Sequence, residues 1–321
     1  MAKQVKIVLL LAVLCGYSSL LSAQVQHYLG WWAQGGEYSY QAVCGATPTF
    51  SLRTSLGGGG GLGFVYELRA GGHFLLDVGV GANSVYTRFK VPDMQSTLHN
   101  VIDSEGEVFD YVFDVTNRKD AYFNTSLQIP LLVGGQWGKF YFLAGAKFDM
   151  VMMSLTTTKA TVSTLGDYKQ YIDPLRNIPS QGFVDGMQWV QKGRASFKPT
   201  VLASAEIGLR LGPVYKETGY DVPQQKIQYR IALFADYAVL DQHKAGDQPL
   251  LHVPATYSVK DPLQGMHATD VMSSREVESL KGRFFPMMIG VKFTMLFRVP
   301  EKKSCVMCKE LPFRSSHGLL E

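Results

Sequence analysis

The sequence is dominated by an alternation of apolar and polar side chains with a period of two. It is clearest in residues 285–297, where Gly290, Lys292 and Thr294 separate apolar neighbours. The apolar positions are Phe285, Met287, Ile289, Val291, Phe293, Met295 and Phe297. Successive side chains of a β-strand point to opposite faces, so this period predicts a strand with one apolar face and one polar face. Only the apolar face is suited to lipid.

The same alternation recurs along most of the chain. The further segments are 61–69, 74–82, 123–131, 140–148, 201–211 and 229–239. Residues 28–40 form one more segment, but the pattern does not settle which of its faces is the apolar one. Together with 285–297 they predict eight strands, each long enough for a tilted strand to cross a bilayer. We therefore expect an all-β fold: an eight-stranded antiparallel transmembrane β-barrel with up-and-down topology and long extracellular loops.

The connections between these segments alternate in length. Residues 41–56, 87–119, 153–197 and 241–282 are long, whereas 69–73 and 133–138 are short. Outer-membrane barrels have long outside loops, short periplasmic turns and both termini inside. With the N-terminus inside, the first connection should be long and the second short, and the lengths in this chain follow that order. The connection 212–227 is longer than this arrangement predicts for its side.

The N-terminus predicts export. Lys3 and Lys6 precede an apolar run at 7–15, and small and polar residues follow up to Ala23, which is the layout of a cleavable signal peptide. The apolar run is too short to cross about 30 Å of hydrocarbon as a helix. A lipoprotein signal ending at Cys15 is the alternative, but Leu14 is bulky where a small residue is needed. The expected domains are a signal peptide 1–23, a barrel 24–298 and a periplasmic tail 299–321.

The polar faces predict a charged barrel interior. Its expected members are Glu67, Arg69, Asp77, Lys147, Asp149, Glu206, Arg210, Arg230, Asp236 and Lys292, with acids and bases in balance. A barrel of eight strands is just wide enough for side chains to fill it. Burying an unpaired charge costs several kcal/mol, so these groups should form ion pairs that plug the interior. A gated ion path through the same groups is the alternative.

Two motifs, a glycine-rich stretch and a C-x-x-C, resemble binding or redox sites but have simpler interpretations. Glycines 57–61 with Gly63 contain a G-x-G-x-x-G pattern, but no helix follows and no Gly-Lys-Ser/Thr sequel is present. We interpret them as the flexible start of the second strand. Cys305 and Cys308 form a C-x-x-C in the tail, where His317 is the nearby histidine, and Cys44 lies far away. A tail disulfide or plain thiols is the favoured interpretation, and a metal or redox role the alternative.

No pattern predicts a catalytic, cofactor or metal site. An acidic stretch at Asp103, Glu105, Glu107, Asp110 and Asp114 could hold a hard cation, but Gly106 stands at the wrong position for a calcium loop. We expect a solvated acidic loop. No serine and histidine share a lipid-facing position at the outer rim, so a nucleophile–base pair is not predicted. The formal net charge of +4 gives no reason to expect nucleic acid.

The signal peptide, the glycine-rich alternating strands and the closing Phe293-Thr294-Met295-Leu296-Phe297 resemble the small OmpA-type outer-membrane barrel proteins. The resemblance covers 24–298 and implies the barrel architecture. OmpA-type proteins often continue into a peptidoglycan-binding domain, whereas here only the short stretch 299–321 follows. Anchoring to the cell wall is therefore not carried over.

The expected function is a non-enzymatic outer-membrane scaffold that serves envelope structure or surface interaction. Its partners would be outer-membrane lipid and another envelope or extracellular protein, reached through the loops 153–197 and 241–282. Loops on a rigid scaffold carry function more often than the scaffold does. The alternatives are a narrow passive channel or the barrel subunit of a secretion machine, and a lipid-modifying enzyme.

Overall fold

The fold of this chain, seen in a computed structural model, is almost entirely β-strand. The structure describes residues 25–43, 53–71, 73–103, 105–212, 227–244, 246–253, 258–279 and 282–300. The long strands are β1 (Gln26–Val43), β2 (Arg53–Ala70), β3 (Phe74–Lys90), β5 (Val108–Trp137), β6 (Phe140–Asp167), β9 (Thr200–Leu211), β10 (Ile227–Ala238) and β13 (Arg283–Arg298). The predicted signal peptide, Cys44, Cys305 and Cys308 lie outside the described residues.

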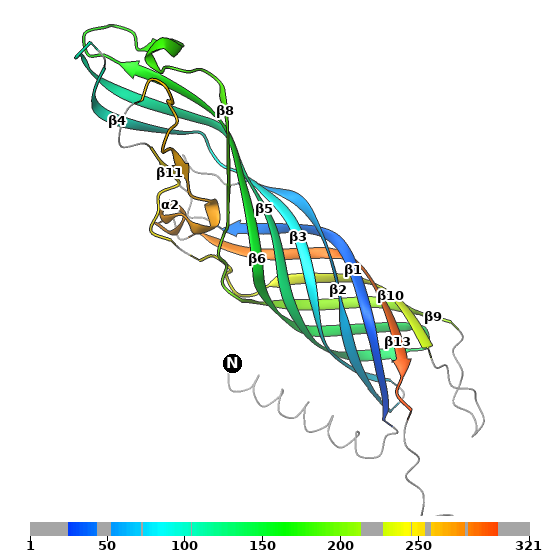
Figure 1. The fold of residues 1–321 in the computed structure, drawn as a ribbon. Helices are drawn as coiled ribbons and strands as arrows, with labels where there is room; N and C mark the ends of the chain where they lie inside the picture. Colours follow the sequence, from blue (N-terminus) through cyan, green and yellow to red (C-terminus); the bar gives the residue numbers. More distant parts are fainter. Residues whose placement is uncertain are drawn as a thin grey trace, which may run out of the picture.

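These long strands form a ring. Each pairs antiparallel with its neighbours in the order β1, β2, β3, β5, β6, β9, β10 and β13, and β13 pairs back with β1. The predicted eight-stranded antiparallel barrel with up-and-down order is confirmed. Figure 1 shows the strands as a tilted cylinder with β1 and β13 side by side. In the described part of the chain, no helix has the length and apolarity needed to cross a bilayer.

The alternation in sequence becomes an alternation between the two faces of the ring. In β10 the burial class switches at every residue from Ile227 to Ala238, with the polar Gln228, Arg230 and Asp236 buried. The apolar partners point outward: Leu62 and Phe64 on β2 are each 68% exposed, and Leu233 on β10 is 62% exposed. This is the reverse of a water-soluble protein, where large apolar side chains are buried and charges are exposed.

Two strands continue far beyond the barrel, which corrects the predicted loops 87–119 and 153–197. β5 has 30 residues and β6 has 28. Their outer parts pair with β4 (Met94–Ile102), β7 (Leu175–Arg176) and β8 (Met187–Gly193) in a sheet that we call the distal sheet. It projects away from the barrel in Figure 1. The acids at 103–114 suggested a loop, but the intervening aromatic and β-branched residues favour strands.

An aromatic core holds the distal sheet together. Phe109 and Tyr168 stack with ring centroids 4.7 Å apart, and Phe183 meets Phe109 edge to face at 5.7 Å. The core also includes Tyr111, Phe113, Val115 and Val162, all almost fully buried. Aromatic pairs of this kind add about 0.5–1.5 kcal/mol each beyond the area they bury. The distal sheet is therefore a packed structure with its own core.

Inside the barrel, glycines make room for one large side chain. Trp32 is 2% exposed, and its indole ring lies against Gly63 and Gly81. A Cβ at Gly81 would overlap that ring and would lie 2.7 Å from the Leu62 carbonyl oxygen. Glycine at position 81 is thus required by the close approach of neighbouring atoms.

We expect Gly81→Val to destabilise the folded barrel by about 1–3 kcal/mol, because the added side chain meets both a ring and a backbone oxygen. The matched control is Ala82→Val on the outward face of the same strand, which should have no such cost. Denaturant unfolding of the detergent-refolded chain, followed by tryptophan fluorescence, measures both. Equal stability of the two variants would contradict the close packing around Trp32.

Candidate functional site

The barrel interior contains two linked groups of buried ion pairs. In the first, the Glu67 carboxylate accepts from Arg69 Nε at 2.5 Å and from Arg230 Nη2 at 2.7 Å. The Arg230 guanidinium also lies 4.0 Å from Asp77. All four residues are at most 9% exposed. They come from β2, β3 and β10, so the charges meet only when the ring is closed.

The second group is centred on Glu206 of β9. Lys292 Nζ donates to Glu206 Oε1 at 2.6 Å, and Lys147 Nζ lies 3.9 Å from the same oxygen. Lys147 also donates to Asp236 at 3.0 Å. The aromatic rings of Trp32 and Phe234 face the two ammonium groups at 5.4 and 5.0 Å. Carboxylates and ring faces together replace the water that these lysines lose.

The remaining two predicted interior residues behave differently. Asp149 is buried but forms no ion pair among the described residues; Ser126 Oγ, Gln128 Nε2 and Gln242 Nε2 donate to it instead. It lines a small cavity of about 20 Å³ together with Asn83 and Asn124, a space sufficient for about one water molecule. Arg210, near the inner end of β9, is half-buried and interacts within the protein.

The outer mouth of the barrel is closed by residues 246–253 and 258–279, which we call the mouth segment. It carries β11 (Leu251–His252), β12 (His267–Ala268), the 3-10 helix η2 (Val271–Ser273) and the short helix α2 (Arg275–Ser279). Its Leu250, Val271, Met272 and Val277 are at most 3% exposed. They pack on a cluster of buried aromatic residues inside the barrel: Tyr40, Phe89, Tyr122, Phe234 and Phe284. The predicted loop 241–282 is thus partly a lid packed into the barrel.

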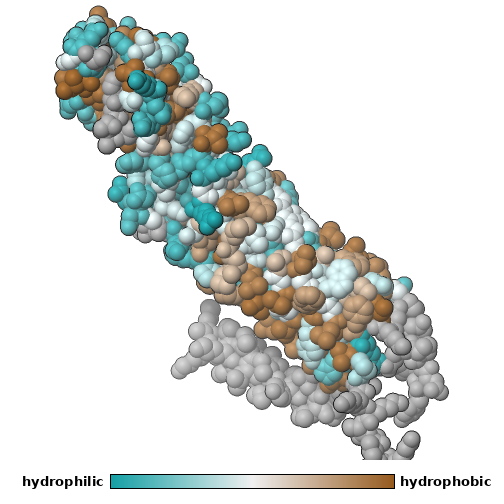
Figure 2. Space-filling model, viewed as in Figure 1, coloured by the Kyte–Doolittle hydropathy of each residue, from teal (hydrophilic) through white to brown (hydrophobic). Residues whose placement is uncertain are grey.

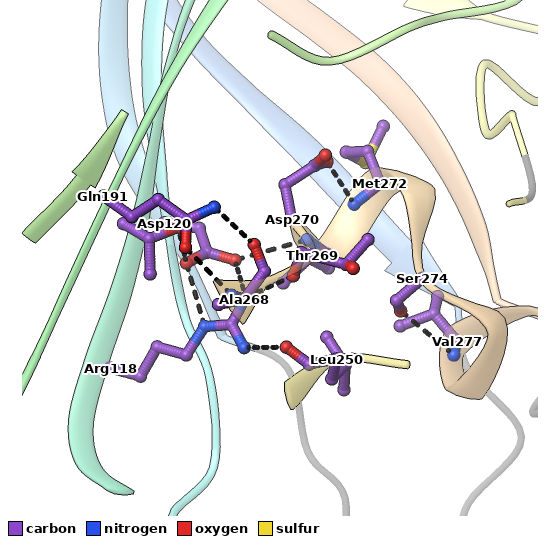
Figure 3. A network of polar contacts seen from close by, with 12 residues as sticks. Arg118, Asp120, Gln191, Leu250, Ala268, Thr269, Asp270, Met272, Ser274 and Val277 are labelled. Atoms are coloured by element: carbon purple, nitrogen blue, oxygen red, sulfur yellow. Dashed lines mark hydrogen bonds and ion pairs between the residues drawn. The ribbon is translucent and has the colours of Figure 1, made fainter. Parts of the chain in front are cut away.

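A buried ion pair ties the mouth segment to β5 (Figure 3). Arg118 donates to both carboxylate oxygens of Asp120, at 3.0 and 2.8 Å, and both side chains are fully buried. The same guanidinium donates to the carbonyl oxygens of Leu250 at 2.8 Å and Thr269 at 2.5 Å. Asp120 in turn accepts from the Val271 N–H at 3.2 Å. Charge-assisted hydrogen bonds of this kind are about twice as strong as neutral ones.

Further contacts extend this attachment on both sides. Tyr122 donates its hydroxyl to Asp270 at 3.0 Å, and the Met272 N–H donates to the same carboxylate at 3.0 Å. Burial raises the pKa of the Asp270 carboxyl above its usual value. Gln191 of β8 exchanges two hydrogen bonds with the backbone of Ala268, each 2.9 Å long. The predicted interaction loops 153–197 and 241–282 therefore contact each other.

Sequence reasoning did not select Arg118, Asp120, Tyr122 or Asp270. The alternation could have identified the first three. They occupy even-numbered positions, like the buried Asn124 and Gln128, whereas the odd-numbered Lys119 and Phe123 point outward. This signal was hidden because the predicted strand started only at residue 123, after the predicted loop 87–119. Asp270 had no such signal, because its role depends on where the mouth segment packs.

The predicted acidic loop is the turn between β4 and β5 together with the first part of β5. Asp103 accepts from the N–H groups of Glu105 and Glu107, both at 2.9 Å. Asp110 accepts from the Asn100 N–H and from His99, and these hydrogen bonds hold the pKa of the Asp110 carboxyl below its usual value. Across the described residues, no group of three His, Cys, Asp or Glu side chains could hold a metal ion.

Comparisons with known proteins do not show a family for this chain. No family model matches the sequence, and no curated protein matches it. Among solved structures, the chain is similar to the crystal structure of Ail, the attachment invasion locus protein of Yersinia pestis, in complex with the heparin analogue sucrose octasulfate. The match covers 85% of this chain and 98% of that chain at 10% identity, with a TM-score of 0.22. The barrel therefore rests on the strand pairings, and OmpA-type membership stays a prediction.

Lys292→Met should destabilise the barrel by about 3–5 kcal/mol, because it leaves the buried Glu206 without its 2.6 Å partner. Adding Glu206→Gln should restore part of the loss, since the unpaired charge is then removed. Unfolding free energies in detergent measure both variants, with Lys139→Met at an exposed turn position as the control. A double variant that loses the sum of the single effects would contradict the pairing.

Arg118→Met should release the mouth segment, because its two hydrogen bonds with Arg118 are lost and Asp120 stays buried without a counter-charge. Hydrogen exchange should speed up for the amides of residues 268–272, while β9 and β10 keep their protection. Lys119→Met, the outward neighbour, is the control. Unchanged exchange in the Arg118 variant would show that the aromatic packing alone holds the lid.

Proposed function

We propose that this chain is an outer-membrane β-barrel protein that holds the distal sheet outside the cell as a surface for contact with another protein. The barrel is the anchor, the termini face the periplasm, and the distal sheet faces outward. In this proposal the barrel is a scaffold without enzymatic activity. The orientation follows from the connection lengths, since outer-membrane barrels have their long connections outside.

One observation carries the membrane assignment: large apolar side chains are exposed around the whole barrel while its charges are buried. Phe64, Leu131, Ile207, Leu233 and Ile289 come from five different strands and are each 55–68% exposed. Figure 2 shows apolar side chains gathered over the barrel and hydrophilic ones where the strands leave it. A continuous apolar belt of this size is unfavourable in water and favourable in hydrocarbon.

The sealed interior supports a scaffold rather than a pore. Ion pairs fill the lumen, and the mouth segment covers its outer end. The described cavity under this lid has room for about one water molecule and is far too small for a hydrated solute to pass. An open channel would require both the lid and the ion pairs to rearrange.

The distal sheet supports the assignment of a contact surface. It has its own aromatic core, so its exposed residues are held in fixed positions. Tyr171 and Ile172 at its far end are 49% and 100% exposed. Exposed aromatic and aliphatic side chains on a rigid support are typical of protein interfaces. The partner is proposed to be another envelope or extracellular protein.

Leu233→Arg tests the membrane assignment. An arginine at mid-barrel should cost roughly 2–4 kcal/mol of insertion, because its charge would face hydrocarbon. Ile172→Arg, at the exposed distal end, should cost nothing. Folding into phosphatidylcholine vesicles, measured by flotation and by heat-modifiable gel migration, compares the two. The wild-type chain should show no steady conductance in a planar bilayer. Equal insertion of both variants, or a persistent open pore, would contradict the proposal.

A further inference from the structure

A row of lysines crosses three neighbouring strands where the barrel meets the distal sheet. In the strand register Lys90 of β3 is opposite Lys119 of β5, and Lys119 is opposite Lys159 of β6. All three side chains are exposed on the outward face. Directly opposite residues in an antiparallel pair have Cβ atoms about 4.5–5.5 Å apart. The row therefore concentrates three positive charges on a narrow strip of the outer wall.

A second row lies one step closer to the barrel. Arg88 of β3 shares its register with Ala121 and Thr157, and Thr157 is opposite Lys192 of β8. Arg88 and Lys192 are also exposed. Arg88 Nε donates to the Tyr86 hydroxyl at 2.5 Å, and its guanidinium lies 5.0 Å from the centre of that ring. We call Arg88, Lys90, Lys119, Lys159 and Lys192 the basic band.

No ion pair within the described protein neutralises the basic band. None of its five side chains forms an ion pair with a described carboxylate. Asp93 is close in sequence, but it accepts from the Asn117 N–H at 3.1 Å. The nearby connection 44–52 contains no Asp or Glu in the sequence. Like charges directly opposite each other destabilise a sheet, so the band carries an uncompensated cost.

The position of the band indicates what compensates that cost. Toward the barrel, the next outward residues of the same strands include Tyr86, Phe123 and Leu155, which are 36–44% exposed and belong to the apolar belt. Away from the barrel, the outward face turns acidic at Asp114 and Asp185, which accept hydrogen bonds from Gln95 and Ser163. The positive charge is thus confined to the edge of the belt, with aromatic residues below it.

We propose that the basic band binds the phosphate groups of anionic lipids in the surrounding leaflet. The inference rests on the proposed function, because the apolar belt must lie in a bilayer for the band to reach the headgroups. Phosphates at this level would supply the missing negative charge, and lysine ammonium groups bind phosphate as point charges from several directions. The Tyr86 ring and hydroxyl would hold Arg88 at the same interface.

The test compares two triple variants with the same change in charge. The band variant carries Lys90→Gln, Lys119→Gln and Lys159→Gln. The control variant carries Lys139→Gln, Lys169→Gln and Lys260→Gln, three lysines that are exposed elsewhere.

The purified full chain in neutral detergent is titrated with diphosphoryl lipid A, with binding followed by native mass spectrometry and by the rise in Tm. The band variant should bind at least about tenfold more weakly than wild type, and the control should be unchanged. Without lipid, the band variant should have the higher Tm, since the repulsion is relieved.

Each opposite outcome is decisive. Equal lipid A binding by the wild type and the band variant, or equal binding of a dephosphorylated lipid A, would overturn the proposal. Displacement of lipid A by inorganic phosphate would show a site for free phosphate and overturn the assignment to lipid. Flotation of all variants with neutral phosphatidylcholine vesicles separates this question from membrane insertion. Loss of insertion there would refute the proposed function itself, whereas normal insertion with unchanged lipid A binding would refute only the inference.

Discussion

The structure depends on how the barrel accommodates charge in its interior. The barrel strands turn an apolar face outward, and their inner faces carry charged residues among buried apolar ones. An isolated buried charge would cost several kcal/mol. Glu67, Arg230, Glu206 and Lys292 meet this constraint by pairing across strands that are far apart in sequence. Closing the ring and pairing the charges are therefore one event, because neither is favourable without the other.

At the outer end of the barrel, buried polar groups are again paired with partners from distant parts of the chain. Above the ion pairs the interior becomes aromatic, and the mouth segment covers these rings with Val271 and Met272. Arg118 and Asp120 join the lid to β5 and satisfy backbone groups that would otherwise be buried without partners. The same strand continues outward into the distal sheet. The lid, the barrel and the distal sheet are thus connected through β5.

Period-two patterning was enough to predict much of this fold. The number of strands, their order and the residues facing the lumen follow from alternation, because a one-residue shift would move every apolar side chain to the wrong face. The start of β5 was predicted too late and the end of β6 too early. For β5 the reason is that acids at 103–114 resemble a loop in sequence. In the structure the first three acids lie in the turn before β5, and Asp110 and Asp114 alternate along β5 with Phe109, Tyr111 and Phe113 of the distal-sheet core. Sequence alone does not show whether such a stretch has a partner to pack on.

The sequence by itself determined the barrel: its eight strand segments, the two faces of most of them, and the charged residues assigned to its interior, nine of which are buried. These depend on local spacing, which any reader of the chain can count. Only the tertiary structure decided which charges pair, that Asp149 has amide and hydroxyl partners, and that Arg118 holds the mouth segment 132 residues away at Leu250. It also decided that Lys90, Lys119 and Lys159 form one row. Register between distant strands sets these contacts, and a closed ring is what fixes that register.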